Sequence, residues 1–264
     1  MTNPKVLILR APGANCDQEA AFAFEQAGAK ATLLHVNRLL ERPAQLGDFQ
    51  ILCLPGGFSY GDDISAGRIL ANQIRHHLFN ALQEFKAAGK LIIGICNGFQ
   101  ILIKSGLLLP DKADEPAATL AQNQSGKFED RWVHLTAGSN KCVFLHGIEN
   151  MYLPVAHGEG QFMTRDSATL DALDNAGQLC LRYASSAEAQ AAGTASNVAY
   201  PSNPNGAQRN VAGVCDETGR VLGLMPHPER HIDPTHHPRW TRREQQPEQG
   251  DGLKLFQNAV AYFA

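Results

Sequence analysis

The stretch KLIIGICNGFQ, residues 90–100, places a cysteine between two glycines at the end of an apolar run. The run LIIGI (91–95) is typical of a strand that is buried on both faces of a parallel sheet. Because a helix is predicted to begin near Asn97, the pattern G-x-C-x-G falls where a strand passes into a helix. This is the context of a nucleophile elbow, a turn so tight that only small residues fit beside the nucleophile. It predicts that Cys96 stands at the carboxyl end of a sheet.

Two interpretations of Cys96 follow from this stretch alone. Free cysteines are among the most buried residue types, so in the first interpretation Cys96 is a small hydrophobic core residue. In the second it is a nucleophile, because the positive end of a helix dipole favours the thiolate, the reactive form of the side chain. The motif does not decide between them without a general base elsewhere in the chain.

Strand-like and helix-like periods alternate through the first hundred residues or so. Strands are predicted at 6–10, 31–36, 51–54 and 91–95, and helices at 17–28 and 68–88. This alternation is typical of an α/β fold, in which helices connect the strands of a parallel sheet. From about residue 128 shorter strands follow, with a hairpin turn at DETG (216–219), and an amphipathic helix over 251–263 ends the sequence. We expect a single domain over 1–264, with loops at 109–125 and 231–250.

Composition limits the classes of protein to consider. The 264 residues are 44% hydrophobic and 19% charged, as in a globular domain, and the net charge of −3 with no basic stripe argues against a nucleic-acid partner. The isolated segment RWTRRE (239–244) is interpreted as a solvated loop or a protein contact. A signal-like start and a membrane-length apolar run are both missing, and the six cysteines are scattered, so we expect a cytoplasmic protein without a membrane partner.

A candidate base lies in the segment LGLMPHPER. His227 stands between two prolines directly after an apolar strand, and Glu229 follows two residues later. The prolines fix the backbone, and the carboxylate can accept a ring proton and keep the imidazole basic. Cys96, His227 and Glu229 then form a nucleophile, a base and an orienting acid. The structural alternative is that His227 merely ends a strand at a turn.

Acyl transfer also needs hydrogen-bond donors for a developing oxyanion. Gly56 and Gly57, in LPGGFSYGDD (54–63), follow a predicted strand, and glycines let backbone N–H groups approach a substrate closely. Their amides, together with the amide after Cys96, are the predicted oxyanion hole. The same P-G-G sequence also suits an ordinary turn.

The motifs LPGGFSYGDD, GICNGFQIL and MPHPER, in this order, resemble the class I (triad) glutamine amidotransferases. PGANCD (12–17), AHGEGQF (156–162), YPSNPNGAQRNVAGVCD (200–216) and the final DG-LFQ narrow the resemblance to the glutaminase subunits of phosphoribosylformylglycinamidine synthase. The match extends over nearly the entire chain. The resemblance implies a flavodoxin-like α/β domain, with a central, mostly parallel sheet flanked by helices and an additional antiparallel β portion.

The resemblance also implies an activity and partners. Cys96 would attack the side-chain amide of glutamine, His227 would shuttle protons, Glu229 would orient His227, and Gly56, Gly57, Asn97 and Gln100 would bind substrate. The ammonia would pass to a large synthetase subunit, which uses ATP and Mg to convert formylglycinamide ribonucleotide (FGAR) into its amidine (FGAM). A small accessory subunit would complete the assembly. No cofactor is expected in this chain, which has no G-x-x-x-x-G-K-[ST] sequence.

Several other residues have two interpretations. Gln100 either supports the elbow or touches substrate, and Asn205 with Gly206 forms a turn that is structural or that meets the substrate or the partner. His157 and Glu159 are expected to border the pocket or the synthetase interface. His231, His236 and His237 lie in a tail segment that is longer than expected for the family, but nothing beside them completes a zinc spacing, so no metal site is predicted.

Two other functions remain possible from the sequence. The first is another cysteine hydrolase of the same fold, such as a γ-glutamyl hydrolase or a peptidase. The second is a redox or stress-binding module that uses a single reactive cysteine and has no need of His227 or Glu229.

Overall fold

A mixed sheet of nine strands forms the centre of the computed structural model, which describes residues 3–110, 115–186, 198–242 and 247–264. The strand order is β2-β1-β3-β4-β11-β10-β9-β6-β7. The parallel half contains β1 (Lys5–Arg10), β2 (Lys30–His35), β3 (Ile51–Leu54), β4 (Leu91–Ile95) and β11 (Val221–Leu224). The antiparallel half contains β10 (Val211–Cys215), β9 (Leu181–Ala184), β6 (Glu129–Ala137) and β7 (Asn150–His157). The predicted fold class is confirmed.

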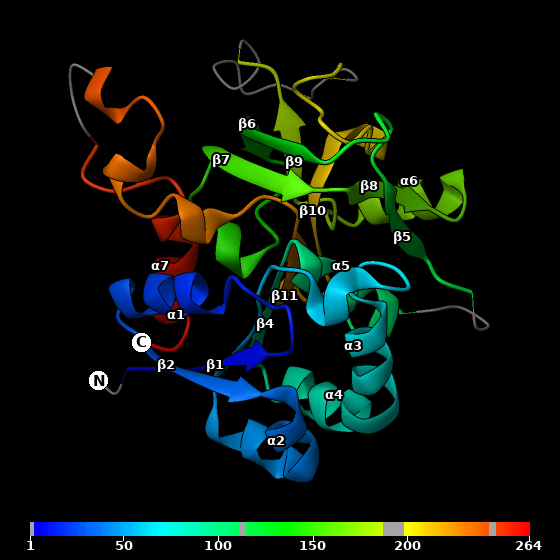
Figure 1. Ribbon diagram of the computed structural model, residues 1–264, viewed down its shortest axis with the longest axis vertical. Helices are drawn as coiled ribbons and strands as arrows, with labels where there is room; N and C mark the ends of the chain where they lie inside the picture. The colour runs from blue at the N-terminus through cyan, green and yellow to red at the C-terminus, as the bar shows by residue number, and fades with distance from the viewer. Residues whose placement is uncertain (1–2, 111–114, 187–197, 243–246) are drawn as a thin grey trace.

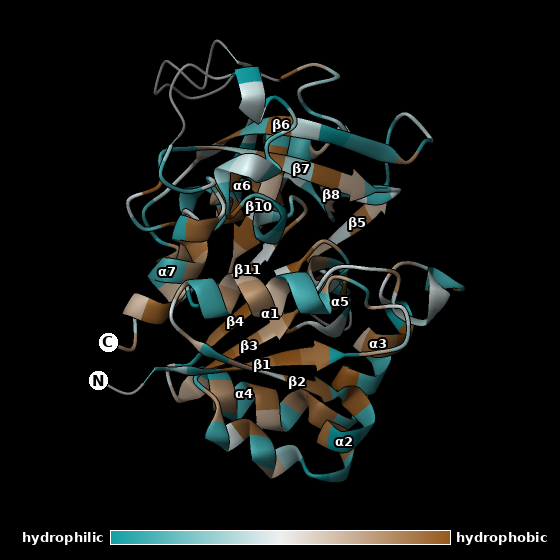
Figure 2. Ribbon diagram, turned by 60° about the vertical axis from the view of Figure 1, so that its left-hand side comes forward, coloured by the Kyte–Doolittle hydropathy of each residue, from teal (hydrophilic) through white to brown (hydrophobic). Residues whose placement is uncertain are grey.

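Helices cover both faces of the parallel half, as its apolar strands require. Every residue of β3 and β4 is buried. Figures 1 and 2 show α1 (Asp17–Gln26) on one side of these strands, and α2 (Val36–Glu41) and α4 (Phe79–Ala87) on the other. The last helix, α7 (Leu253–Ala261), packs on α1, where the rings of Phe24 and Phe256 meet edge to face at 4.9 Å.

The strands and helices predicted in the first hundred residues are confirmed, with one irregularity. The helix predicted over 68–88 is a run of α3 (Arg68–Gln73), the π-helical turn η3 (Ile74–Leu78) and α4. A π turn widens one turn of a helix without changing its apolar spacing greatly, so periodicity alone does not reveal it.

The loop predicted over 109–125 is wrong in its second half. Residues 111–114 lie outside the described part, but β5 (Ala118–Gln122) pairs antiparallel with β8 (Glu159–Thr164) in a separate small sheet. Leu120 of β5 is buried opposite Phe162. The strand is short and its partner lies about forty residues later, so the sequence around it carried only a weak signal.

Two helices were not anticipated, α2 and α6 (Ser167–Asn175). The start of α6 carries a capping signal, because the Asp166 side chain accepts a 2.6 Å hydrogen bond from the Thr169 amide. Such a cap could have predicted the helix.

The tail segment 231–250 packs against the antiparallel half through aromatic rings. It contains the short turns η8 (Pro234–His236) and η9 (Trp240–Arg242), while residues 243–246, including the end of RWTRRE, lie outside the described part. The ring of Trp132 in β6 lies 5.0 Å from the ring of His231 and 5.3 Å from that of His237. In the described residues, no helix has the length and apolar character needed to cross a membrane.

Candidate active site

The predicted tight turn is present at Cys96. This residue follows β4 and directly precedes α5 (Asn97–Ser105), with φ 50° and ψ −105°, a left-handed backbone that is strained for a residue with a side chain. A Cβ added at Gly98 would lie 1.9 Å from the Leu54 carbonyl oxygen, and one at Gly94 would lie 2.5 Å from the Gly98 carbonyl oxygen. Both glycines of G-x-C-x-G are therefore required by close backbone packing.

Neighbouring strands enclose Cys96. Its amide donates a 2.7 Å hydrogen bond to the carbonyl of Leu224, the last residue of β11. Its sulfur lies 3.7 Å from the Ala156 carbonyl oxygen in β7, and the residue is only 5% exposed. Because β11 runs parallel to β4, the segment after β11 reaches the same edge of the sheet as Cys96.

That segment carries the His227–Glu229 pair. Nδ1 of His227 lies 2.6 Å from Oε1 of Glu229, and both side chains are buried. The His227 amide donates to the Pro154 carbonyl at 2.9 Å, which attaches the turn to β7. Pro228 and Glu229 begin the short turn η7 (Pro228–Arg230), so the proline fixes the backbone between the two paired side chains.

Charged groups at this edge of the sheet determine the protonation state of His227. Burial lowers the pKa of the imidazole, but the carboxylate of Glu229 and the sulfur of Cys96 outweigh burial and raise the pKa well above its ordinary value. Nε2 is buried, and interactions with the Cys16 and Cys96 thiols also raise the pKa of the ring. The structure thus brings Cys96, His227 and Glu229 together, although they come from separate parts of the sequence.

A second cysteine, whose place in the site the sequence does not predict, lies beside the pair. Cys16 Sγ is within 4.8 Å of a His227 ring nitrogen and a Glu229 oxygen, and it accepts a 3.1 Å hydrogen bond from Nη2 of Arg230. Arg230 also donates to Glu19 at 3.1 Å. Cys16 ends the segment PGANC, which was noted only as part of a family pattern, so the motif was visible but its contact with His227 was not.

The two glycines predicted to form the oxyanion hole lie on the loop after β3, where Gly56 contacts the His227 ring. A Cβ on Gly56 would be 2.8 Å from Cε1 of His227 and 3.2 Å from Cys16 Sγ, so the backbone packs directly on the imidazole. Gly57 has φ 136°, and a Cβ there would be 2.5 Å from the Gly13 carbonyl oxygen. Only glycine fits either position, and the donor role of their amides stays a prediction.

Asn97 links the elbow to the loop that follows β3. Its Oδ1 accepts from the Ser59 amide at 3.2 Å, and its Nδ2 donates to Asp62 at 3.1 Å and to Gln100 Oε1 at 2.9 Å. Nε2 of Gln100 donates to the Glu159 carbonyl at 2.6 Å. Both polar atoms of Gln100 are thus used within the protein, which favours support of the elbow over contact with substrate.

His157 is a buried, uncharged imidazole at the edge of the site. Burial and then the positive charge of His227 lower its pKa to about 3. Its Nδ1 lies 3.0 Å from Asn123 Oδ1. Glu159 accepts a hydrogen bond from the Ala66 amide at 3.3 Å and forms an ion pair with Lys104 at 3.6 Å. These contacts hold the loop after β3 in position.

Two roles were predicted for Asn205, and the structure shows the structural one. It is fully buried, donates to the Tyr183 hydroxyl at 3.1 Å and accepts from the Ala207 amide at 3.0 Å. A cavity of about 800 Å³ lies near this turn, lined in part by Gln124, Tyr200 and Arg209, and no member of the Cys96, His227 and Glu229 group lines it.

Among the described residues, two groups have metal-ligating atoms close together. One is Cys16, His227 and Glu229, and the other is Cys142, Cys180 and Cys215. The tail histidines are not in either group, and Nδ1 of His231 lies 2.9 Å from the Tyr152 carbonyl.

A strained cysteine beside a buried imidazole–carboxylate pair is the arrangement of a thiol acyl-transfer enzyme, and comparison with known proteins agrees with it. The model of the CobB/CobQ-like glutamine amidotransferase domain matches residues 3–263. The chain belongs to this glutamine amidotransferase family.

Individual relatives of this amidotransferase are similar over almost their full length. Phosphoribosylformylglycinamidine synthase subunit PurQ of Dehalococcoides mccartyi is 45% identical, with 99% of this chain and 98% of that protein covered. The PurQ subunit of Methanococcus maripaludis is 41% identical, with 98% and 97% covered. A chain in the structure of PurLQS from Thermotoga maritima is 32% identical, covers 100% of both chains and superposes with a TM-score of 0.73.

Proposed function

We propose that this chain is the glutaminase subunit of phosphoribosylformylglycinamidine synthase. It hydrolyses glutamine to glutamate and ammonia, and the ammonia is used by a synthetase subunit to convert FGAR into FGAM in purine biosynthesis. The observation that carries the proposal is the strained Cys96 beside the buried His227–Glu229 pair, in a chain 45% identical to a PurQ subunit over nearly its whole length.

The geometry supports a two-step mechanism. The Cys96 thiolate attacks the side-chain amide carbon of glutamine, and the raised pKa of His227 supplies an imidazolium that gives its proton to the leaving nitrogen as the C–N bond breaks. Water then attacks the glutamyl thioester, His227 takes a proton from that water, and the C–S bond breaks. Glutamate and ammonia leave, and the thiolate–imidazolium pair is restored.

Backbone amides are the proposed electrophilic stabilisers. The first amides of a helix have no partner within it, so those of Asn97 and Gly98 at the start of α5 are available to an oxyanion. Gly56 packs directly on the His227 ring, and Gly57 packs on the backbone of Gly13. Asn97 holds the loop that carries them through Ser59, which gives it a positioning role in substrate binding.

A partner supplies the rest of the reaction. The loop after β3 exposes Phe58 and Ile64, and the Phe58 ring stacks on the exposed ring of Phe128 at 6.3 Å. This apolar surface beside the catalytic edge suits docking of a synthetase subunit and of a small accessory subunit, as the naming of the PurLQS structure suggests. We propose that ATP and Mg act in the synthetase and that this chain, residues 1–264, works as one domain without a cofactor.

A cytoplasmic location is part of the proposal. All six cysteines are free, including three whose sulfur atoms lie within 4.8 Å of one another. Free neighbouring thiols suit a reducing compartment.

The test is glutamine hydrolysis by the full chain, alone and with the synthetase and accessory subunits, ATP, Mg and FGAR, for wild type and for Cys96→Ala. Ammonia release that rises with the loaded partners and disappears in Cys96→Ala supports the proposal. Cys142→Ala, a substitution of a buried cysteine away from the catalytic edge, is the control and should retain activity.

Two outcomes would reject it. Faster turnover of a γ-glutamyl peptide than of glutamine would indicate another hydrolase of the same fold. Unchanged thiol reactivity and function after His227→Ala would indicate a redox module, because such a protein does not need the base.

A further inference from the structure

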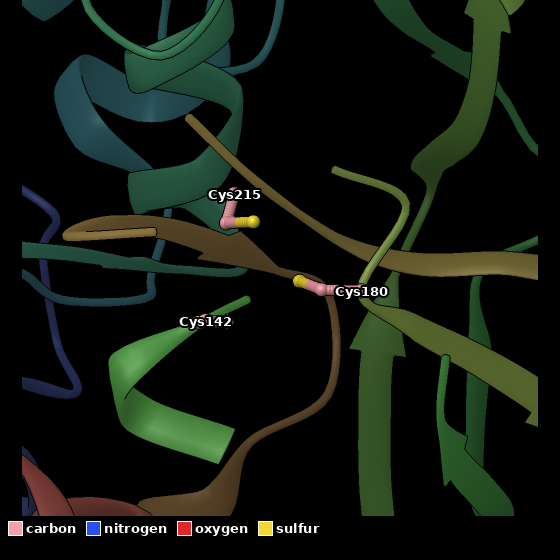
Figure 3. Close-up of side chains that lie close together, drawn as sticks. All are labelled: Cys142, Cys180 and Cys215. Atoms are coloured by element: carbon pink, nitrogen blue, oxygen red, sulfur yellow. The ribbon is translucent and has the colours of Figure 1, made fainter. Parts of the chain in front are cut away.

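Three cysteines that are far apart in the sequence meet in the interior of the protein. The sulfur atoms of Cys142, Cys180 and Cys215 all lie within 4.8 Å of one another, and the three residues are completely buried. Figure 3 shows the sulfur atoms of Cys180 and Cys215 pointing into the space between their segments. All three are free thiols. We refer to these three residues as the trithiol cluster.

The trithiol cluster is separate from the catalytic edge. Cys215 ends β10 and pairs with Leu222, near the start of β11, whereas His227 follows the other end of β11. Cys180 directly precedes β9, and Cys142 directly precedes the turn η4 (Val143–Leu145). The mechanism of glutamine hydrolysis therefore makes no use of these thiols.

Backbone hydrogen bonds hold the cluster in place. The amides of Cys180 and Cys215 both donate to the Gln178 carbonyl at 2.9 Å, and the Gln178 side chain donates back to the Cys215 carbonyl at 3.0 Å. The Cys180 carbonyl accepts from the Gly138 amide at 2.7 Å. Sulfur positions are thus fixed by strands and turns before any ligand arrives, which lowers the entropic cost of binding.

The thiols have only weak partners in the protein. Cys180 Sγ is 3.7 Å from the Gly213 carbonyl oxygen, and Cys215 Sγ is 3.9 Å from the Gly177 carbonyl oxygen. Within the described residues, no histidine, carboxylate or fourth cysteine completes the group. The group therefore offers three sulfur ligands.

We propose that Cys142, Cys180 and Cys215 form a three-coordinate binding site for a soft monovalent ion, Cu(I). Thiolate sulfur selects soft ions such as Cu(I), whereas structural zinc requires four ligands in a tetrahedron. Each Cu–S bond replaces one S–H bond, and the three protons leave to solvent while copper stays Cu(I). Two charged neighbours act on the cluster: the carboxylate of Asp216, which pairs with Lys86 at 3.5 Å, adds negative charge, and Lys141, next to Cys142 in the sequence, offsets part of the negative charge of the complex.

The test measures copper uptake in a background that lacks the thiols of the active site. Full-length Cys16→Ala/Cys96→Ala protein is titrated with Cu(I) without oxygen, in competition with a chromophoric Cu(I) chelator, and is also refolded with excess Cu(I) so that burial does not block entry. We expect one Cu(I) per chain, with three sulfur ligands by X-ray absorption. The further substitution Cys215→Ala should abolish uptake, and Cys53→Ala, which removes a buried thiol outside the cluster, should not.

Cys142→Ala and Cys180→Ala replace Cys215→Ala if that variant fails to fold, as judged by thermal unfolding. The proposal is overturned if refolded protein takes up no copper, if Cys215→Ala and Cys53→Ala bind equally, or if zinc binds in four-coordination with the same residue dependence. Copper stoichiometry does not depend on glutamine hydrolysis, so failure here is distinguishable from failure of the proposed function.

Discussion

Nδ1 of His227 lies 2.6 Å from Oε1 of Glu229, and both side chains are removed from solvent. This contact reverses the effect that burial alone would have on the imidazole. Burial lowers the pKa of His227, whereas the carboxylate, followed by the sulfur of Cys96, raises it well above its ordinary value. In the proposed mechanism, the pair therefore keeps a proton available for the leaving nitrogen of glutamine.

Glu229→Gln removes the charge that raises the pKa of His227, so we expect the imidazolium to lose its proton at a lower pH than in wild type. Because the imidazolium is the form that protonates the leaving amide nitrogen, the alkaline limb of the kcat/KM profile for glutamine should move to lower pH. The maximal rate should fall by about 10²- to 10⁴-fold. Glu217→Gln, an exposed change in the DETG turn, is the control, and an unmoved alkaline limb would contradict the role of Glu229.

Cys16→Ala removes the sulfur that packs beside His227 and accepts from Arg230. Because Cys16 is one of the groups that raise the pKa of His227, we expect kcat to fall roughly tenfold, equivalent to about 1.4 kcal/mol, with KM for glutamine unchanged. The measurement is steady-state glutamine hydrolysis. Cys142→Ala, which removes a buried sulfur away from the catalytic edge, controls for a general cost of losing a core thiol. Equal effects of the two substitutions would show that Cys16 has no specific role in the site.

Gly98→Ala places a Cβ 1.9 Å from the Leu54 carbonyl oxygen, so the start of α5 must move away from β3. We expect a loss of about 1–3 kcal/mol in the free energy of unfolding, measured with urea, together with slower alkylation of Cys96. Gly47→Ala is the matched control, because a Cβ there meets nothing within 4 Å. If Gly98→Ala unfolds at the wild-type urea concentration, the elbow is less tightly packed than described.

Asn97→Ala removes the hydrogen bonds to Ser59 and Asp62, which hold a loop containing left-handed residues at Tyr60 and Asp62. Without them the strained loop should loosen, so KM for glutamine should rise roughly tenfold, the equivalent of about 1.4 kcal/mol of binding. Hydrogen exchange of amides 57–67 should accelerate. Asn72→Ala, on the exposed face of α3, is the control. Unchanged exchange in this loop would show that other contacts hold it.

Much of the site could be predicted because its requirements are local. A strand followed by G-x-C-x-G forces a tight turn through sterics between residues that are neighbours in the chain, and Gly94 and Gly98 bear this out. His227, Pro228 and Glu229 are likewise close in sequence, so a pairing of base and carboxylate could be inferred from spacing alone. The hairpin at DETG and the buried strands β3 and β4 follow from the same short-range patterns.

Contacts between residues far apart in the sequence could not be predicted. The pairing of β5 with β8 depends on two segments separated by a strand pair, and the loop expected at 109–125 was wrong for that reason. Gln100 keeps two possible roles in the sequence because one of its partners, the Glu159 carbonyl, belongs to β8 and becomes evident only when that strand is in place.

By itself the sequence determined the α/β order of elements, the tight turn at Cys96 and the pairing of His227 with Glu229, since backbone sterics and apolar periodicity act over a few residues. Only the tertiary structure decided that Cys16 lies beside His227 and that Cys142, Cys180 and Cys215 share one buried space. The physical reason is that strand order and register, which emerge when the apolar faces pack, set which distant side chains meet.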